Sequence, residues 1–240
     1  MRLGLLGLGR IGAFHAETLA GLPAVEELVI SDPVPALAEQ VAARFGARIA
    51  GSPEAVLASG VDGMIIAAPT GFHTELMELC VAAGLPAFCE KPVSRDSDKA
   101  AQLARRVAAA GVPVQIGYPR RFDPAFAAAR AAVADGELGT VLTVRSTTLD
   151  PAPPTRAYLA ESGGIFRDCA VHDYDAVRWV TGTTRAATTC GWRCTAAGTA
   201  SRPGWARGSR CGRPSRACRS RTASRSRSSW TGWARRSVLN

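Results

Sequence analysis

The sequence has no uninterrupted apolar run of membrane-spanning length, and its amino-terminal residues do not read as a secretory signal. The apolar stretch after Met1 is too short and too rich in glycine for such a signal. A disulfide scaffold is not indicated either, because Cys80, Cys89 and Cys169 lie in or beside apolar segments, as small buried residues do. We therefore expect a protein of the reducing cytoplasm.

Acidic residues and lysine are absent from residues 183–240, although this segment carries 13 arginines and a net charge of +13. Residues 1–182 carry 16 basic and 20 acidic residues, a net charge of −4. The formal charge of +9 for the 240 residues therefore describes neither part. The apolar fraction of 47% over the 240 residues is ample for a packed core, so the composition predicts a globular protein.

Residues 2–117 alternate short β-rich runs with helical patterns, such as 35–45 and a helix that follows the cap Ser52. The strands that we expect are 3–6, 28–30, 48–50, 64–66, 87–89 and 114–116. Strands separated by crossover helices form a parallel sheet with both faces covered. The pattern predicts an α/β fold, a doubly wound Rossmann domain over residues 1–119, with ligands at the carboxyl ends of its strands.

Residues 120–182 follow a different pattern. An alanine-rich helix is expected near 124–134, a strand of alternating character at Thr140–Ser146, and a helix from about 172 to 181. One strand and two helices do not make a sheet with both faces buried. The segment therefore predicts the incomplete beginning of an α+β domain.

A glycine-rich loop follows the first strand and opens a helix, which is the context that a dinucleotide fingerprint requires. Its first glycine permits a tight turn, its second lets backbone amides approach a pyrophosphate, and its third lets helix and strand pack closely. The expected cofactor contacts of this loop are Gly7, Gly9, Arg10, Ile11 and Gly12. Glycines that serve an ordinary turn are the alternative interpretation.

Asp32 lies 20 residues beyond Gly12, at the end of the second strand. A carboxylate there accepts hydrogen bonds from ribose hydroxyls and repels a 2′-phosphate. The position strengthens the dinucleotide interpretation and favours NAD over NADP.

Two further strands end in polar residues that we expect at the cofactor. Pro69, Thr70 and His73 follow the fourth strand, where a plain turn with a threonine cap is the alternative. Glu90 and Lys91 follow the fifth strand, which directs Lys91 into the same crevice. A lysine there can bind a substrate hydroxyl or support proton removal, whereas a solvated surface lysine is the alternative.

Asp168 and His172 are four residues apart, so on a helix they share a face and the carboxylate can orient the imidazole. Hydride leaves a secondary alcohol only as its hydroxyl proton departs, and His172 is a base of suitable pKa. The alternative is a histidine that caps the following helix, with Asp173 and Asp175 as solvated acids of its first turn.

Over residues 1 to about 182 the chain resembles the Gfo/Idh/MocA oxidoreductases, in the motifs 7–12, 69–73, 90–92, 117–123 and 163–175. The resemblance implies a Rossmann domain followed by a domain with an open mixed sheet, which shapes the substrate pocket and commonly the oligomer interface. It also implies that Lys91, Asp168 and His172 are catalytic, with His172 as the acid/base.

The segments around Arg120 and His172 look most like those of inositol 2-dehydrogenases, so the implied substrate is a polyol or sugar. No metal is implied. A homo-oligomer of the family type is expected only if the C-terminal domain is intact. A dinucleotide-binding protein without turnover remains the alternative.

Members of this family continue well beyond the histidine helix, but here the composition changes abruptly after Gly182. Arginine, serine, cysteine and tryptophan replace any alternating apolar pattern, as in GC-rich DNA read out of register. We predict a frameshift, genuine or a sequencing error, near residue 183, and a disordered tail over 183–240.

At face value the tail is an Arg/Ser segment that could bind nucleic acid by neutralising phosphates, which is the less favoured alternative. A zinc site is not expected, because the tail has no histidine and its cysteine spacings match no common finger. The four cysteines concerned are Cys190, Cys194, Cys211 and Cys218.

Overall fold

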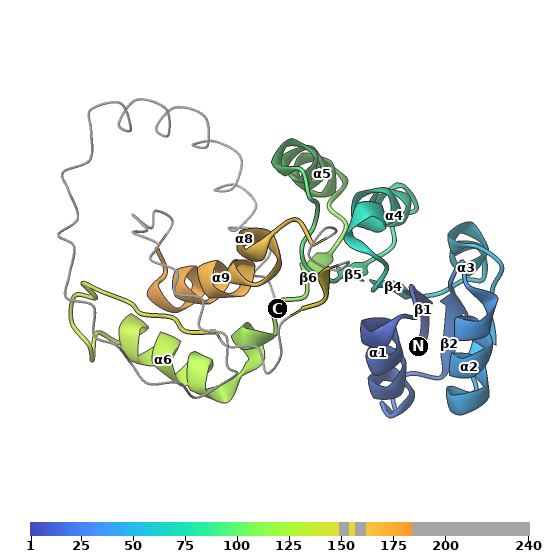
Figure 1. The fold of residues 1–240 in the computed structure, drawn as a ribbon, viewed down its shortest axis with the longest axis horizontal. Helices are drawn as coiled ribbons and strands as arrows, with labels where there is room; N and C mark the ends of the chain where they lie inside the picture. The colour runs from blue at the N-terminus through green and yellow to red at the C-terminus, as the bar shows by residue number, and fades with distance from the viewer. Residues whose placement is uncertain (149–153, 157–161, 184–240) are drawn as a thin grey trace.

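Six parallel strands form the first part of the molecule (Figure 1). The computed structural model describes residues 1–148, 154–156 and 162–183. The strands are β1 (Arg2–Leu6), β2 (Glu27–Ser31), β3 (Arg48–Ile49), β4 (Gly63–Ile66), β5 (Ala87–Cys89) and β6 (Val114–Ile116). Their order is β3-β2-β1-β4-β5-β6, so the chain winds outward in both directions from β1 and β4. The predicted doubly wound sheet is confirmed.

Crossover helices connect these strands, and local sequence signals set several of their ends. The helices are α1 (Arg10–Ala20), α2 (Pro35–Phe45), α3 (Pro53–Ala58), α4 (Thr70–Ala82) and α5 (Ser97–Ala110). Helix α2 has a proline at its first position and ends at Gly46, whose φ of 70° is readily adopted by glycine. Helix α3 is capped by the Ser52 hydroxyl, which accepts a hydrogen bond from the Ala55 amide at 3.2 Å.

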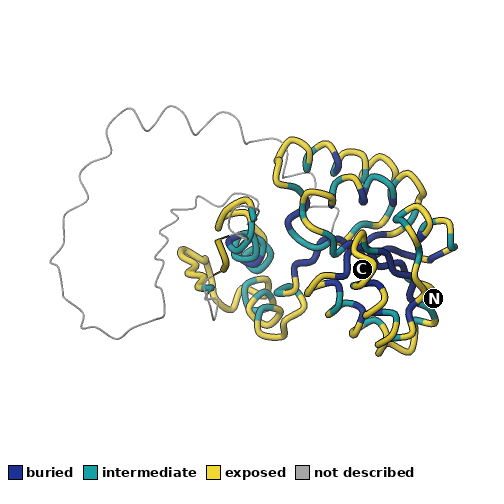
Figure 2. Tube along the Cα trace, turned by 45° about the vertical axis from the view of Figure 1, so that its right-hand side comes forward, coloured by how far each residue is buried: buried dark blue, intermediate teal, exposed yellow. Residues whose placement is uncertain are grey.

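Both faces of the sheet are buried, because neighbouring apolar residues along a strand point to opposite sides. In β1, Leu5 belongs to the core cluster that includes residues of α1 and α2, while Leu6 belongs to the cluster that includes residues of α3, α4 and α5. Figure 2 shows the buried residues concentrated in this sheet. Cys80 and Cys89 are buried in the second cluster, as expected of small core residues.

The second part begins after β6 and consists of four described helices that lie beside the sheet domain (Figure 1). They are the 3₁₀ helix η1 (Pro119–Phe122), α6 (Pro124–Ala134), α8 (Ile165–Asp168) and α9 (Ala170–Thr181). The Asp123 carboxylate caps α6 through the amides of Ala125 and Phe126. Helices α6 and α9 lie side by side, and the Arg130 guanidinium stands over the Trp179 ring, 4.7 Å from its centroid.

The strand predicted at Thr140–Ser146 is wrong: residues 141–148 run without strand pairing. A strand exists only where a neighbouring strand accepts and donates its backbone hydrogen bonds, and no described strand pairs with this segment. The side chains of Leu142 and Val144 are 89% and 47% exposed as a result. The predicted helix near 124–134 is confirmed, whereas the helix expected from about 172 begins at Ala170.

We predicted a frameshift near residue 183 and a disordered tail over 183–240. Residues 184–240 lie outside the described part of the chain. Within the described part, none of the helices combines the length and apolar character that crossing a membrane requires.

The unpaired apolar segment leads to a prediction about association. We expect the 240-residue chain to self-associate, because Leu142 and Val144 present apolar side chains on an unpaired backbone edge. Leu142→Lys should reduce the association seen by size-exclusion chromatography with light scattering. Leu22→Lys, at a 47% exposed leucine of the sheet domain, is the matched control and should leave it unchanged. A monodisperse monomer of the unmodified chain would contradict the prediction.

Candidate active site

The glycine loop between β1 and α1 adopts a conformation that depends on its glycines. Gly7 has a φ of 86°, and a Cβ there would lie 2.5 Å from the backbone of Ala68. A Cβ on Gly12 would lie 1.9 Å from the Gly7 carbonyl oxygen, so this position admits only glycine. Gly9, by contrast, caps α1 and has open space where a Cβ would point. The loop therefore leaves free volume at the amino end of a helix, where anions bind.

The two residues after Gly9 begin helix α1, and both are exposed. Arg10 and Ile11 therefore lie at the surface, directly after the open space at Gly9. The described residues place no side-chain cap on α1. Unsatisfied amides at a helix start attract negative charge, which is the property that a pyrophosphate uses.

Asp32 follows β2 and already has two partners within the chain. Its Oδ2 accepts from the Leu8 amide at 2.6 Å, and its Oδ1 accepts from the Val34 amide at 2.8 Å. The carboxylate thus fastens the glycine loop to the neighbouring strand end. Each oxygen keeps a further lone pair, so the ribose role predicted from the sequence is compatible with these bonds.

Pro69 and Thr70 lie at the turn between β4 and α4, next to the glycine loop. Pro69 is the exposed N-cap of α4 and Thr70 is its first residue, and no side chain caps the helix. The alternative of a threonine cap is therefore wrong. A Cβ on Gly7 would meet Ala68 directly before this turn, which shows how closely the two loops approach each other.

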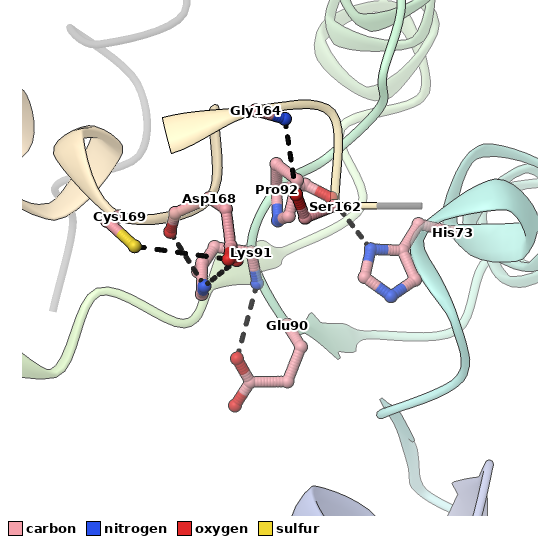
Figure 3. Close-up of polar contacts among 8 residues, drawn as sticks. All are labelled: His73, Glu90, Lys91, Pro92, Ser162, Gly164, Asp168 and Cys169. Carbon is pink, nitrogen blue, oxygen red and sulfur yellow. Dashed lines mark hydrogen bonds and ion pairs between the residues drawn. The ribbon is translucent and has the colours of Figure 1, made fainter. Parts of the chain in front are cut away.

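His73 lies beneath this turn and is 1% exposed. Its Nδ1 faces the Pro92 carbonyl oxygen at 2.8 Å (Figure 3). Its Nε2 faces the Ala68 carbonyl oxygen at 2.7 Å. Both ring nitrogens are therefore engaged with the backbone of this chain. The imidazole thus bridges the loop after β4 and the loop after β5. From the sequence, His73 was expected to contact the cofactor.

Lys91 follows β5 and reaches across to the second part of the molecule. Its Nζ donates to Asp168 Oδ1 at 3.0 Å and to the Asp168 carbonyl oxygen at 2.9 Å (Figure 3). The two side chains are 20% and 14% exposed, so solvent screens this ion pair less than it does a surface pair. The structure thus brings Lys91 and Asp168 together, and the solvated-lysine alternative is wrong.

Asp168 and His172 do not share one continuous helix. Asp168 ends α8, and α9 begins at Ala170 after a break at Cys169. His172 is half-buried in the first turn of α9, and its ring packs edge-on against Tyr118 with 6.3 Å between centroids. The helix-capping alternative is also wrong, because the N-cap of α9 is Cys169 and no side chain caps it.

The environment of His172 lowers its pKa below the ordinary value. Burial is the main cause, and the positive charges of Lys91 and Arg120 add to it. The negative charges of Glu90 and Asp173 act in the opposite direction and do not outweigh them. At neutral pH the imidazole is therefore neutral and able to accept a proton.

Two ion pairs connect η1 to α9, and sequence reasoning missed both. Arg120 donates to Asp173 at 2.6 Å, and Arg121 donates to Asp175 at 2.5 and 2.8 Å. The two aspartates are thus not the solvated acids of the alternative interpretation. The signal was present in the sequence as two adjacent arginines and two aspartates that are two residues apart, but only the fold places them opposite each other.

Neighbouring groups shift two more pKa values in this region. Burial of Asp173 would raise its pKa, but hydrogen bonds from Ser146, Arg120 and Thr148 outweigh burial and lower it. Burial raises the pKa of Tyr118 to about 12, and the negative charge of Asp175 adds to this. Tyr118 therefore stays protonated beside His172 at any physiological pH.

A second histidine, His15 on α1, was also missed. Its Nε2 lies 2.8 Å from Glu90 Oε1, although the two residues are 75 positions apart in the chain. The other Glu90 oxygen accepts from the Lys91 amide at 3.3 Å (Figure 3). Glu90 was predicted as a cofactor contact, and the structure places its carboxylate between the glycine-loop helix and Lys91.

Comparison with known protein families identifies both parts of the chain. Residues 1–118 match the model of the "Oxidoreductase family, NAD-binding Rossmann fold", and residues 126–200 match the "GFO/IDH/MocA C-terminal domain". The chain belongs to the Gfo/Idh/MocA oxidoreductases. The second match extends past the boundary that we predicted near residue 183. The sheet domain of this Gfo/Idh/MocA chain is thus an NAD-binding Rossmann fold.

Several inositol dehydrogenases are similar to this Gfo/Idh/MocA chain. Inositol 2-dehydrogenase of Rhizobium meliloti is 37% identical over 182 residues, which are 76% of this chain and 55% of the relative. Myo-inositol dehydrogenase Hyg17 of Streptomyces leeuwenhoekii is 40% identical over 183 residues, 76% of this chain and 56% of the relative. The chain thus spans about half the length of the curated relatives it matches.

Solved structures of such enzymes share the fold. The myo-inositol dehydrogenase of Corynebacterium glutamicum has a TM-score of 0.66 at 39% identity, over 75% of this chain and 54% of that one. The scyllo-inositol dehydrogenase of Lactobacillus casei, solved with NAD(H) and scyllo-inositol, has a TM-score of 0.69 at 29% identity, over 76% and 56%.

The buried imidazole of His73 gives a prediction about stability. His73→Phe should lower the free energy of unfolding by about 2–4 kcal/mol, because two carbonyl oxygens lose their buried partner. Phe72→Ala, at the 55% exposed neighbour on the same helix, is the control and should change it by about 0.5 kcal/mol. Urea denaturation measures both. Equal effects of the two substitutions would contradict the bridging role of His73.

Proposed function

We propose that this chain binds NAD and derives from an enzyme that oxidises a secondary hydroxyl of an inositol-like polyol or sugar. The observation that carries the proposal is the ion pair between Lys91 and Asp168. It brings the end of β5 to the break between α8 and α9, directly before the helix that carries His172. A cation that follows β5 and a neutral base on α9 support a dehydrogenase site at the carboxyl edge of the sheet.

The residues of the glycine loop fit the cofactor. The open space at Gly9 and the uncapped start of α1 suit a pyrophosphate, whose charge the helix amides stabilise. Asp32 suits ribose hydroxyls and disfavours a 2′-phosphate, which supports NAD rather than NADP. Pro69, Thr70 and Glu90 follow neighbouring strands, at the edge where the nicotinamide half would lie. When bound, NAD supplies a hydride acceptor.

The acid/base steps belong to the residues of the chain. His172, neutral because its pKa is lowered, takes the proton of the substrate hydroxyl as general base. The Lys91 ammonium stabilises negative charge that develops on the substrate oxygen. Asp168 holds that ammonium in place through two hydrogen bonds from Nζ. In the reverse direction, the protonated His172 returns the proton to the product oxygen.

The proposal also covers the class of substrate and the subcellular location. The relatives named as inositol dehydrogenases support a cyclic polyol as the substrate. The similarity to dehydrogenases of small polyols supports action in the cytoplasm on a small molecule, without a membrane or nucleic-acid partner. Homo-oligomer formation of the family type would need the sheet of the second domain.

Binding of NAD without turnover is the second candidate. It is favoured by the extent of the similarity, which covers only 55% of the Rhizobium meliloti relative, and by the absence of a second sheet among the described residues. Assay of the 240-residue chain with NAD and a panel of inositols and sugars separates the candidates. If NADH forms from NAD in the assay, the chain oxidises the substrate. If the chain binds added NADH but forms none from NAD, the second candidate is supported. Absence of NADH binding contradicts both.

Two glycine substitutions on α1 test the cofactor site. Gly9→Ala should leave the melting temperature unchanged but weaken NADH binding at least about tenfold, because its methyl group enters the open space where we place the pyrophosphate. Gly21→Ala, at the other end of α1 with ordinary contacts of 3.5 Å, should affect neither. NADH fluorescence titration measures affinity. Unaltered binding by Gly9→Ala would place the cofactor elsewhere.

The lowered pKa of His172 is open to direct measurement, because the chain has only three histidines. Titration of the imidazole resonances by NMR, with His172→Gln to assign them, should give His172 a pKa below about 6.5. Arg120→Gln should raise that pKa, because one of the positive charges that disfavour the imidazolium is removed. His172 is therefore expected to be deprotonated, and able to act as a general base, already below neutral pH. A pKa above the ordinary value would contradict this.

A further inference from the structure

The Glu90 carboxylate links two elements that the proposed function treats separately. On one side it contacts His15 in the second turn of α1, the helix whose start we assign to the pyrophosphate. On the other side it accepts the backbone N–H of Lys91. The side chains of His15 and Glu90 are 19% and 22% exposed, so neither is an ordinary surface group.

The surroundings confine both side chains. The Phe88 ring packs edge-on against the imidazole of His15, with 5.4 Å between centroids. A Cβ on Gly117 would lie 3.0 Å from the Phe88 ring and 3.1 Å from Glu90 Oε2, so glycine at this position leaves room for the carboxylate. Residues of three elements, α1, β5 and the end of β6, thus define one place for Glu90.

We propose that His15 is a positioning residue, which holds the Glu90 carboxylate against the backbone of Lys91 and thereby couples the nucleotide-binding helix to the catalytic lysine. The catalytic meaning of this coupling rests on the proposed function, whereas the coupling itself is a property of the folded chain. His15 needs no contact with substrate to act, because its effect passes through Glu90.

The charges around Glu90 support this role. Burial by itself would raise the pKa of Glu90, but the hydrogen bond and charge of His15, the Lys91 amide and the Lys91 charge together lower it. The negative charge of Glu90 also acts on two other titratable groups. It acts to raise the pKa of the Cys89 thiol and that of the His172 imidazole on α9. Without His15, burial is opposed only by Lys91, so Glu90 would take up a proton at a higher pH.

The test uses the lysines, because Lys91 and Lys99 are the only two in the chain. Lys99 is exposed on α5 and serves as an internal standard for labelling by an amine-reactive reagent, read by mass spectrometry. In the unmodified 240-residue chain, Lys91 should react more slowly than Lys99. His15→Phe keeps a ring but removes the donor, and should raise the ratio of Lys91 to Lys99 labelling about threefold or more. His15→Gln retains an N–H donor and should restore most of the protection.

A second readout separates positioning from a general loss of stability. The pKa of Glu90, followed by carboxyl ¹³C NMR and assigned with Glu90→Gln, should rise in His15→Phe and lie closer to the unmodified value in His15→Gln. Unchanged labelling and an unchanged Glu90 pKa in a folded His15→Phe chain would overturn the proposal. If His15→Phe does not fold, Glu90→Gln carries the same labelling test, because one amide oxygen cannot replace both carboxylate oxygens.

Failure of the proposed function has a different signature. An unmodified chain that binds no NADH would contradict the cofactor assignment, yet the labelling ratio and the Glu90 titration would still report on the coupling. If NADH binds, His15→Phe should weaken it about threefold to tenfold, and His15→Gln should weaken it less. Equal NADH affinity in all three chains would overturn the link to the nucleotide-binding helix.

Discussion

The ion pair between Lys91 and Asp168 is the contact on which the geometry of the site depends. It joins residues 77 positions apart and brings the end of β5 to the break before α9. Within the second part, Arg120 and Arg121 of η1 pair with Asp173 and Asp175 of α9. Charge pairing of partly buried groups thus holds the second part against the sheet, where an apolar interface would otherwise be expected.

Patterns that act over short distances in the sequence predicted the sheet domain well. Helix α2 was predicted as 35–45 and has those bounds, since apolar periodicity, a proline at its start and a glycine at its end agree. The six strands were predicted to within about a residue of their bounds. A strand that is buried on both faces appears in the sequence as a short apolar run bounded by turn residues, and such runs are easy to recognise. The glycine loop was predicted from the spacing of its glycines, and the structure shows that Gly7 and Gly12 occupy positions where a side chain would be strained or would clash.

Contacts between distant segments could not be predicted in the same way. The pairing of His15 with Glu90 depends on how α1 lies against β5, and neither residue carries a local signal for the other. The strand predicted at 140–146 failed for the opposite reason, because its alternation is genuine but a strand also needs a partner. Asp168 and His172 have helical spacing, yet the chain breaks between them at Cys169.

The apolar clusters on the two faces of the sheet draw their buried members almost entirely from residues before η1 begins. The only later residue that packs on either cluster is Val171, which contributes from the first turn of α9 among the described residues. A genetic lesion downstream of β6 would therefore separate two losses that usually come together. It would remove α8 and α9 while leaving the buried members of both apolar clusters in place.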